Sequence, residues 1–109
     1  MKTENSVELI GYLGNDPICK TAVNGSSMAR IRLATDRFRR DRGGTVHRKT
    51  TWHDILAWDT VAEQVPNNFI KGSHVLIKGE IRHRTYNDNT GHKRYITEVH
   101  AHKIMNLDR

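Results

Sequence analysis

The sequence is poor in residues that could cross-link a small domain or place it in a membrane. It has one cysteine, Cys19, so no disulfide forms within the chain, as is typical of proteins in a reducing compartment. No apolar run approaches the roughly 20 residues that cross a bilayer. The N-terminal stretch "MKTENSVELIG" lacks the apolar segment of a secretory signal. These shortages predict a cytoplasmic protein that does not enter a membrane.

Hydrophobic residues are also scarce, at 36% of a chain of 109 residues. This length predicts one domain, residues 1–109, and a domain of this size has a thin core. Association with further copies of the chain would bury additional apolar surface. The sequence contains no internal repeat, linker or low-complexity segment.

Positive charge is abundant and concentrated in one segment. The formal net charge is +6. All of this surplus lies in residues 30–49, whose basic side chains outnumber Asp36 and Asp41: Arg30, Arg32, Arg37, Arg39, Arg40, Arg42, Arg48 and Lys49. A local basic segment attracts polyanions, nucleic acid first and an anionic membrane second. From charge alone, a solvated loop is an equally good interpretation.

Alternating hydrophobicity predicts an all-β chain. Strands are expected over residues 6–13, 28–38, 47–58, 74–86 and 93–104, with residues 18–23 continuing the first strand past a bend. Gly43 and Gly44 predict a flexible basic loop over residues 39–45. A short helix should begin with Asp59 or Thr60 as its N-cap and end or bend near Val65, because Pro66 follows.

The order of these elements is three strands, one short helix and two strands. It predicts a five-stranded antiparallel OB-fold Greek-key barrel with the helix between the third and fourth strands.

The stretch "TTWHDILAWDT" places two tryptophans on one predicted strand. Side chains alternate along a strand, so Trp52 and Trp58 share one face with Leu56, and His53 and Ile55 take the other. Other predicted strands also carry aromatic or basic side chains opposite an aliphatic face: Arg30, Arg32, Phe38, Arg82, Arg84 and Tyr86. Unpaired bases stack on aromatic rings for about 1–3 kcal/mol each, and guanidinium groups neutralise phosphates. The pattern therefore predicts a surface for single-stranded nucleic acid, the alternative being that the tryptophans fill the core.

Several motifs, in order, resemble the bacterial single-stranded DNA-binding proteins: "VELIGYLGNDP", "IRLAT", "TTWHDILAW", "AEQV", "KGSHVLIKGEIRHRTY" and "RYITEV". The resemblance covers residues 5–105. It implies an OB fold, a homotetramer, a nucleoid-associated location, and sequence-tolerant binding of single strands in replication, recombination and repair.

The resemblance also implies roles for single residues. Trp52, Trp58 and Tyr86 match stacking aromatics of the family, and Arg82 and Arg84 match basic positions of the binding strand. Phe38 lies in the region of another family aromatic, and His53 matches a position near the subunit interface. Arg39 and Arg40, in the basic loop, are expected to add phosphate contacts.

The sequence departs from the family at its end and at single positions. Ser6 stands where a lysine is common, which removes one potential phosphate contact. Family members often continue into a linker and an acidic tip that recruits replication and repair proteins, whereas this sequence stops at "NLDR". The resemblance is therefore to a short form without the tail: either the sequence is part of a longer protein, or the protein binds DNA without recruiting those partners.

Two other functions compete with this prediction. One is a dimeric, primosome-type OB-fold replication protein, which the oligomer mass would distinguish. The other is a metal-dependent nuclease or phosphoesterase that uses the histidines and Asp54. His100 and His102 share a strand face, but no Cys-x-x-Cys or His-Glu-x-x-His motif accompanies them, so they are interpreted as chance surface histidines. We expect no enzyme activity, cofactor or metal.

Overall fold

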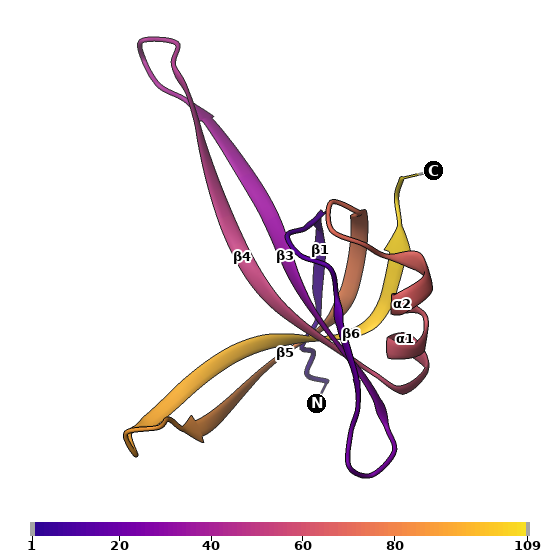
Figure 1. Ribbon diagram of the computed structural model, residues 1–109. Helices are drawn as coiled ribbons and strands as arrows, with labels where there is room; N and C mark the ends of the chain where they lie inside the picture. Colours follow the sequence, from indigo (N-terminus) through magenta and orange to yellow (C-terminus); the bar gives the residue numbers. More distant parts are fainter. Residues whose placement is uncertain (1, 109) are drawn as a thin grey trace.

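Two long β-hairpins and a short first strand form a barrel in the computed structural model, which describes residues 2–108 (Figure 1). The elements are β1 (Val7–Leu13), β2 (Ile18–Thr21), β3 (Ser27–Arg40), β4 (Val46–Trp58), α1 (Asp59–Glu63), α2 (Val65–Asn68), β5 (His74–Asn87) and β6 (Lys93–Asn106). The strand order is β1-β5-β6-β4-β3-β2, and a further β1–β3 pairing closes the barrel. This closed five-strand barrel, with its helical segment between β4 and β5, confirms the predicted OB fold.

Two details of the sheet differ from the expectation. β2 does not continue β1 but is a separate edge strand that pairs with β3, from Ile18 opposite Arg30 to Thr21 opposite Ser27. The segment between β1 and β2 is held against the segment between α2 and β5, where the Lys71 amide donates to Asp16 Oδ1 at 2.8 Å. The sheet is also not wholly antiparallel, since β4 and β6 pair in parallel at Ile55 opposite Val99.

The core lies on the inner face of the barrel strands. Alternate residues of β3, β4 and β5 point inward and are fully buried, namely Ile31, Leu33, Ile55, Val75 and Ile77. Two glycines let strands approach where the barrel closes. A Cβ at Gly11 would collide with the Ala34 carbonyl oxygen, and one at Gly79 with the His100 carbonyl oxygen.

The predicted single helix is split into α1 and α2 at Gln64, two residues before Pro66, in agreement with the expected bend. The predicted N-cap is wrong: Trp58 occupies that position without a capping side-chain bond, and Asp59 has φ of 54°. The segment covers the core with Ala62, Val65 and Phe69. No helix within residues 2–108 is long and apolar enough to cross a membrane.

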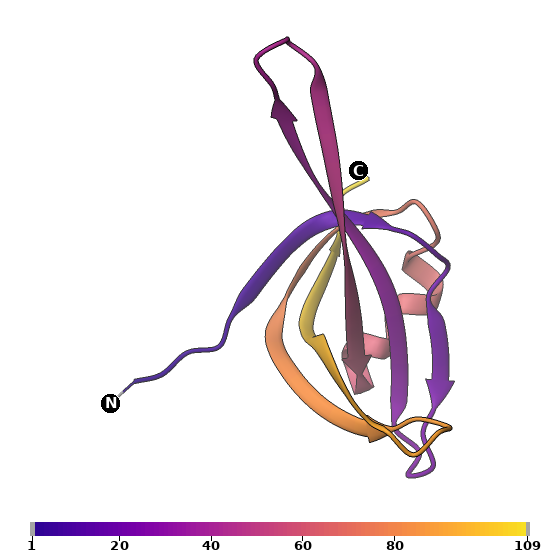
Figure 2. The same ribbon diagram turned by 90° about the vertical axis from the view of Figure 1, so that its left-hand side faces the viewer.

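The β3–β4 hairpin extends well beyond the barrel, and we call its outer part, residues 36–51, the basic arm (Figures 1 and 2). The loop predicted over residues 39–45 is shorter than expected, because strand pairing continues to Arg40 opposite Val46. The turn is held by Asp41, whose Oδ1 accepts from the Gly43 and Thr45 amides at 2.9 and 3.0 Å. Mobility of the arm in the free protein remains a prediction.

The β5–β6 hairpin ends in a turn of the same design and diverges from the basic arm (Figure 1). Asp88 Oδ1 accepts from the Thr90 and His92 amides at 2.9 and 3.0 Å, and Asp88 Oδ2 accepts from Arg94 Nε at 2.7 Å. Both turns thus use one aspartate to satisfy backbone donors that a tight turn leaves free.

Candidate nucleic-acid interface

Both tryptophans lie on the outer face of the β3–β4 ladder. Trp52 is opposite Ala34 and Trp58 is opposite Met28, and residues opposite each other in a ladder share a face. The indoles are 48% and 38% exposed, whereas Ile55 between them is fully buried on the inner face. The tryptophans therefore do not fill the core, which removes the alternative left open by the sequence.

Leu56 differs from the tryptophans with which it shares a face, because it is only 5% exposed. It is opposite Arg30 on β3 and opposite His100 on β6. These two longer side chains flank it on both sides. The outer face consequently has a small apolar centre between the two exposed indoles.

The parallel pairing of Leu56 with His100 joins this surface to β6 and β5. Arg82 is opposite Glu98 and Tyr86 is opposite Arg94, so both lie on the same outer face. We call this surface the binding face and define it by these residues: Arg30, Arg32, Trp52, Trp58, Arg82, Arg84 and Tyr86. The ladders thus bring together side chains that the sequence predicted separately on three strands.

The basic arm carries the remaining predicted residues, and they do not all share one face. Phe38, opposite Arg48, and Arg40, opposite Val46, continue the outer face, and Phe38 is 64% exposed. Arg39 is opposite His47 and lies on the other face of the arm.

The Trp52 ring packs closely against Gly14. A Cβ on Gly14 would collide with Trp52 Cζ3 and come within 2.7 Å of Cη2, so the indole lies against the glycine backbone. The Arg32 guanidinium lies over the ring with its Cζ 5.2 Å from the centroid, a cation–π contact. A groove of about 440 Å³ beside the ring is lined by Trp52 together with Tyr12, Gly14, Ala34, Asp36 and Arg48.

Carboxylates on the binding face hold its arginines in place. Arg32 Nε is 3.9 Å from Asp54 Oδ1, and Arg82 donates to Glu80 at 3.3 Å. The Arg82 hydrogen bond is the largest cause that holds the pKa of Glu80 below its usual value. Exposed ion pairs of this kind are weak, so a phosphate can compete with the carboxylate for the arginine.

Arg84 is held more firmly than Arg82. Its Nε donates to Glu98 Oε1 at 2.9 Å, and the Glu98 side chain is only 3% exposed. A carboxylate this deeply buried needs its cation, because an unpaired buried charge is costly. The Arg84 guanidinium also lies 5.9 Å from the centroid of the Tyr86 ring.

His53 lies on the inner face where the two hairpins part. Its Nε2 is 2.9 Å from Thr35 Oγ1, and burial lowers the pKa of the imidazole. It lines a hollow of about 300 Å³ together with Val7, Leu9, Trp52, Asp54, Ile81, Thr97, Glu98 and Val99. Its expected contact with a second subunit remains a prediction.

Sequence reasoning missed two residues of this surface, Gly14 and Glu98. No sequence signal indicates that Gly14 contacts an aromatic ring two strands away. Glu98 had a usable signal, since alternation along residues 93–104 puts it on the face of His100.

The two histidines proposed as alternative metal ligands each contact a carboxylate. His100 Nε2 is 3.3 Å from Glu98 Oε1, and His102 Nε2 is 3.2 Å from Glu80 Oε1. Within residues 2–108, no group of three or more His, Cys, Asp or Glu side chains is placed to hold a metal ion. The metal-dependent nuclease alternative therefore finds no centre in the described part of the chain.

Comparison with known proteins identifies the family of this chain. Residues 4–107 match the Single-strand binding protein family. The chain is 40% identical over 96 residues to single-stranded DNA-binding protein 1 of Chlorobaculum tepidum, covering 87% of this chain and 59% of the relative. It is 35% identical over 103 residues to the single-stranded DNA-binding protein of Xanthomonas axonopodis pv. citri, covering 94% and 57%. The chain thus spans about three fifths of the length of these curated relatives.

A solved structure agrees with the sequence relatives. The SSB of Plasmodium falciparum, in complex with ssDNA, superimposes with a TM-score of 0.88 at 30% identity, covering 99% of this chain and 98% of that one. These relatives are named as DNA-binding proteins rather than enzymes, in agreement with the sequence-based expectation. The motifs, the barrel and the comparisons lead to one conclusion: the chain belongs to the Single-strand binding protein family.

Proposed function

We propose that this chain binds single-stranded DNA with little sequence preference, by stacking bases on aromatic rings and pairing phosphates with arginines. One observation carries the proposal: β4 and β5, joined through β6, bear Trp52, Trp58 and Tyr86 on a single outer face that also carries arginines. Every unpaired base has a π-face, so stacking tolerates any sequence. In a duplex the base faces are covered by their neighbours, and this surface would meet only phosphates.

Fluorescence anisotropy of end-labelled oligonucleotides tests the proposal. A labelled oligo-thymidine should bind far more tightly than a duplex of the same length at the same salt concentration. Adding Mg²⁺ or Mn²⁺ should leave the single strand at full length on a denaturing gel. Equal affinity for both forms would overturn the stacking mechanism, and shortening of the oligonucleotide would favour the enzyme alternative.

We further propose that the chain works as a homotetramer. An apolar patch on the outer face of β1, β5 and β6 supports this, where Ile10 is opposite Leu76 and Leu76 is opposite Met105. Ile10 and Met105 are 51% and 42% exposed, and neighbouring Tyr12 is 53% exposed. An exposed apolar patch of this kind is typical of surfaces that meet a partner.

The cellular role belongs to the same proposal. A protein that covers single strands without regard to sequence protects the intermediates of replication, recombination and repair, and would act in the cytoplasm, where the nucleoid lies. The barrel and the two hairpins within residues 1–109 would form the DNA-binding unit. Recruitment of replication and repair proteins is not proposed for this segment.

A further inference from the structure

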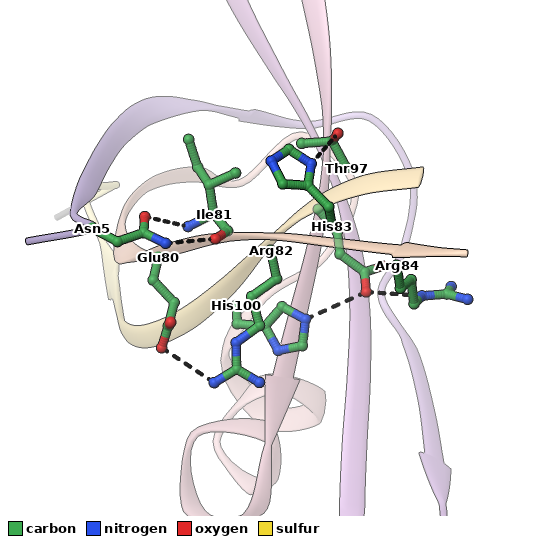
Figure 3. Close-up of polar contacts among 9 residues, drawn as sticks. Asn5, Glu80, Ile81, Arg82, His83, Arg84, Thr97 and His100 are labelled. Atoms are coloured by element: carbon green, nitrogen blue, oxygen red, sulfur yellow. Dashed lines mark hydrogen bonds and ion pairs between the residues drawn. The ribbon is translucent and has the colours of Figure 1, made fainter. Parts of the chain in front are cut away.

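Two histidines that the proposed binding mode does not use lie among its charged residues on the outer face of β5 and β6. We call this group the histidine–carboxylate cluster, and it consists of Glu80, Arg82, Arg84, Glu98, His100 and His102. In Figure 3, one dashed line joins Arg82 to the Glu80 carboxylate, and two others join Arg84 and His100 to a second carboxylate, which belongs to Glu98. Each carboxylate of the cluster is thus shared between one arginine and one histidine.

The inner pair of the cluster is built around buried Glu98. Its Oε1 accepts from Arg84 Nε at 2.9 Å and lies 3.3 Å from His100 Nε2. The side chains of Glu98 and His100 are 3% and 15% exposed, whereas that of Arg84 is 44% exposed. Any influence of His100 on a phosphate outside the protein would therefore pass through Glu98 and Arg84.

The outer pair of the cluster is open to solvent. Glu80 Oε1 lies 3.3 Å from Arg82 and 3.2 Å from His102 Nε2. The imidazole of His102 is 63% exposed and Arg82 is 56% exposed. Both cations can therefore reach a phosphate that approaches the binding face, once Glu80 no longer holds them.

Protonation of the two imidazoles changes the net charge of the cluster. With neutral imidazoles, two carboxylates cancel two guanidiniums, and with both imidazoles protonated the net charge of the cluster is +2. Imidazoles ordinarily take up a proton near pH 6.5, and a phosphate backbone favours the charged form. Binding of a polyanion and protonation of the cluster should therefore reinforce each other.

The surrounding elements supply charges of both signs. Charged and titratable groups outside the cluster on the neighbouring strands and on α1, which packs against β6, are Arg30, Arg32, His53, Asp54, Asp59, Glu63, Lys78, His83 and, on β6 itself, Lys103. The two imidazoles among them, His53 and His83, lie on the opposite face of their strands. A pH response that disappears when His100 and His102 are replaced is therefore a response of the cluster.

We propose that His100 and His102 set the affinity of the binding face for single-stranded DNA through their protonation. Each protonated imidazole neutralises the carboxylate that it contacts, and the arginine that shared this carboxylate becomes available to a phosphate. Protonated His102 also contacts a phosphate of the DNA directly. This inference rests on the proposed function, and it makes DNA binding tighter at mildly acidic pH.

The test is the affinity for labelled oligo-thymidine at pH 7.5, 6.5 and 5.5, at constant ionic strength. We expect the wild-type protein to bind about tenfold more tightly at pH 5.5 than at pH 7.5. The slope of log affinity against log salt should be steeper by about 1.4 at pH 5.5, because two more phosphates are neutralised at about 0.7 each. The double variant H100Q/H102Q should show less than about a threefold change in affinity and no change in slope.

Matched variants separate the cluster from other histidines. His83 lies on the other face of β5, where its Nδ1 is 2.8 Å from Thr97 Oγ1, so H83Q should keep the wild-type pH response. Glu80→Gln should bind more tightly than wild type at pH 7.5, because it frees Arg82 at every pH. If the double variant fails to fold, the single H102Q variant at an exposed position should still lose about half of the response.

The outcomes distinguish this inference from the proposed function. A pH response that survives in H100Q/H102Q, or a wild-type affinity that does not change with pH, would overturn the inference and leave single-strand binding intact. Absence of oligo-thymidine binding at all three pH values would instead overturn the proposed function.

Discussion

At the scale of single residues, the contact between Gly14 and Trp52 has a testable consequence. A methyl group at position 14 would collide with the far edge of the indole, so Gly14→Ala should displace the ring rather than the barrel. We expect G14A to weaken oligo-thymidine binding by about tenfold, which corresponds to roughly 1.4 kcal/mol, within the range of one stacked base. The melting temperature should change little.

A double-mutant cycle gives the control for this prediction. Phenylalanine lacks the outer indole atoms that meet position 14, so G14A should have little effect when combined with Trp52→Phe. Gly43→Ala is a matched glycine substitution, because its Cβ would meet only Asp41 Oδ1 at 3.5 Å. If G14A weakened binding equally with and without the Trp52→Phe substitution, the ring contact would not be the cause.

Arg84 should contribute to stability as well as to binding. Among residues 2–108, Arg84→Ala leaves buried Glu98 with His100 as its one remaining ionic partner, and we expect the free energy of unfolding to fall by about 1–3 kcal/mol. Arg82→Ala should leave stability nearly unchanged and make the salt slope shallower by about 0.7. Urea denaturation and salt titration of both variants measure these effects, and equal stability losses would contradict the assignment.

Sequence alternation was enough to place Trp52 and Trp58 on one face, because a strand period of two is a local property, but it left open whether that face was exposed. It was not enough to show that Leu56 on that face is buried, since its cover comes from Arg30 and His100 on neighbouring strands. Which side chains flank a residue across a sheet depends on register, and register is a property of the whole barrel.

At the scale of elements, the two projecting hairpins share an aspartate-centred turn. The hydroxyl of Thr90 and then the guanidinium of Arg94 are the main causes that lower the pKa of Asp88 to about 2. Because the folded-state pKa lies below the ordinary value near 3.8, the carboxylate supports the turn at pH 4 and above, and this support is lost as the pH falls through about 2. An NMR titration of the Asp88 carboxyl measures this directly, and a midpoint near 3.8 would contradict it.

The basic arm should contribute affinity without selecting bases. Replacing residues 38–48 by Asn-Gly would join Arg37 to Lys49, which are already opposite each other, with a two-residue turn. We expect affinity for oligo-thymidine and oligo-adenine to fall by a similar factor and the barrel to remain folded, since the removed residues are exposed. A changed preference between the two oligonucleotides at unchanged overall affinity would show that the arm recognises bases.

The order of the elements was predictable, but their ends and partners were only partly so. Gly43 and Gly44 indicated a long loop, whereas cross-strand pairing extends β3 to Arg40 because Asp41 closes a short turn. The separate strand β2 was not foreseen, since its pairing with β3 depends on a turn anchored by Asp16 to the segment before β5.

At the scale of the whole molecule, burial of His53 links folding to pH. Burial is the main cause that lowers the pKa of His53, so the unfolded chain binds a proton that the folded chain resists. The resulting stability is full above the unfolded pKa and falls as the pH drops through the folded one. Urea midpoints at pH 7.5 and 5 should therefore differ less in His53→Gln than in wild type, and equal differences would contradict this.

The proposed tetramer uses the apolar patch on β1, β5 and β6 as a contact surface between copies of the chain. Light scattering at micromolar concentration should give the mass of a tetramer, and Ile10→Glu, which places a charge in the patch, should lower that mass. A monomer mass for the wild-type protein would contradict the proposal, and a dimer mass would favour the primosome-type alternative.

The proposed function requires the exposed tryptophans to stack on unpaired bases, and tryptophan fluorescence reports this stacking. Titration with oligo-thymidine should strongly quench the emission of the wild-type protein, and Trp52→Phe and Trp58→Phe should each remove part of that quenching. A duplex of the same length should quench very little at the same salt concentration. Equal quenching by the two forms of DNA, or binding of single strands without quenching, would contradict the account.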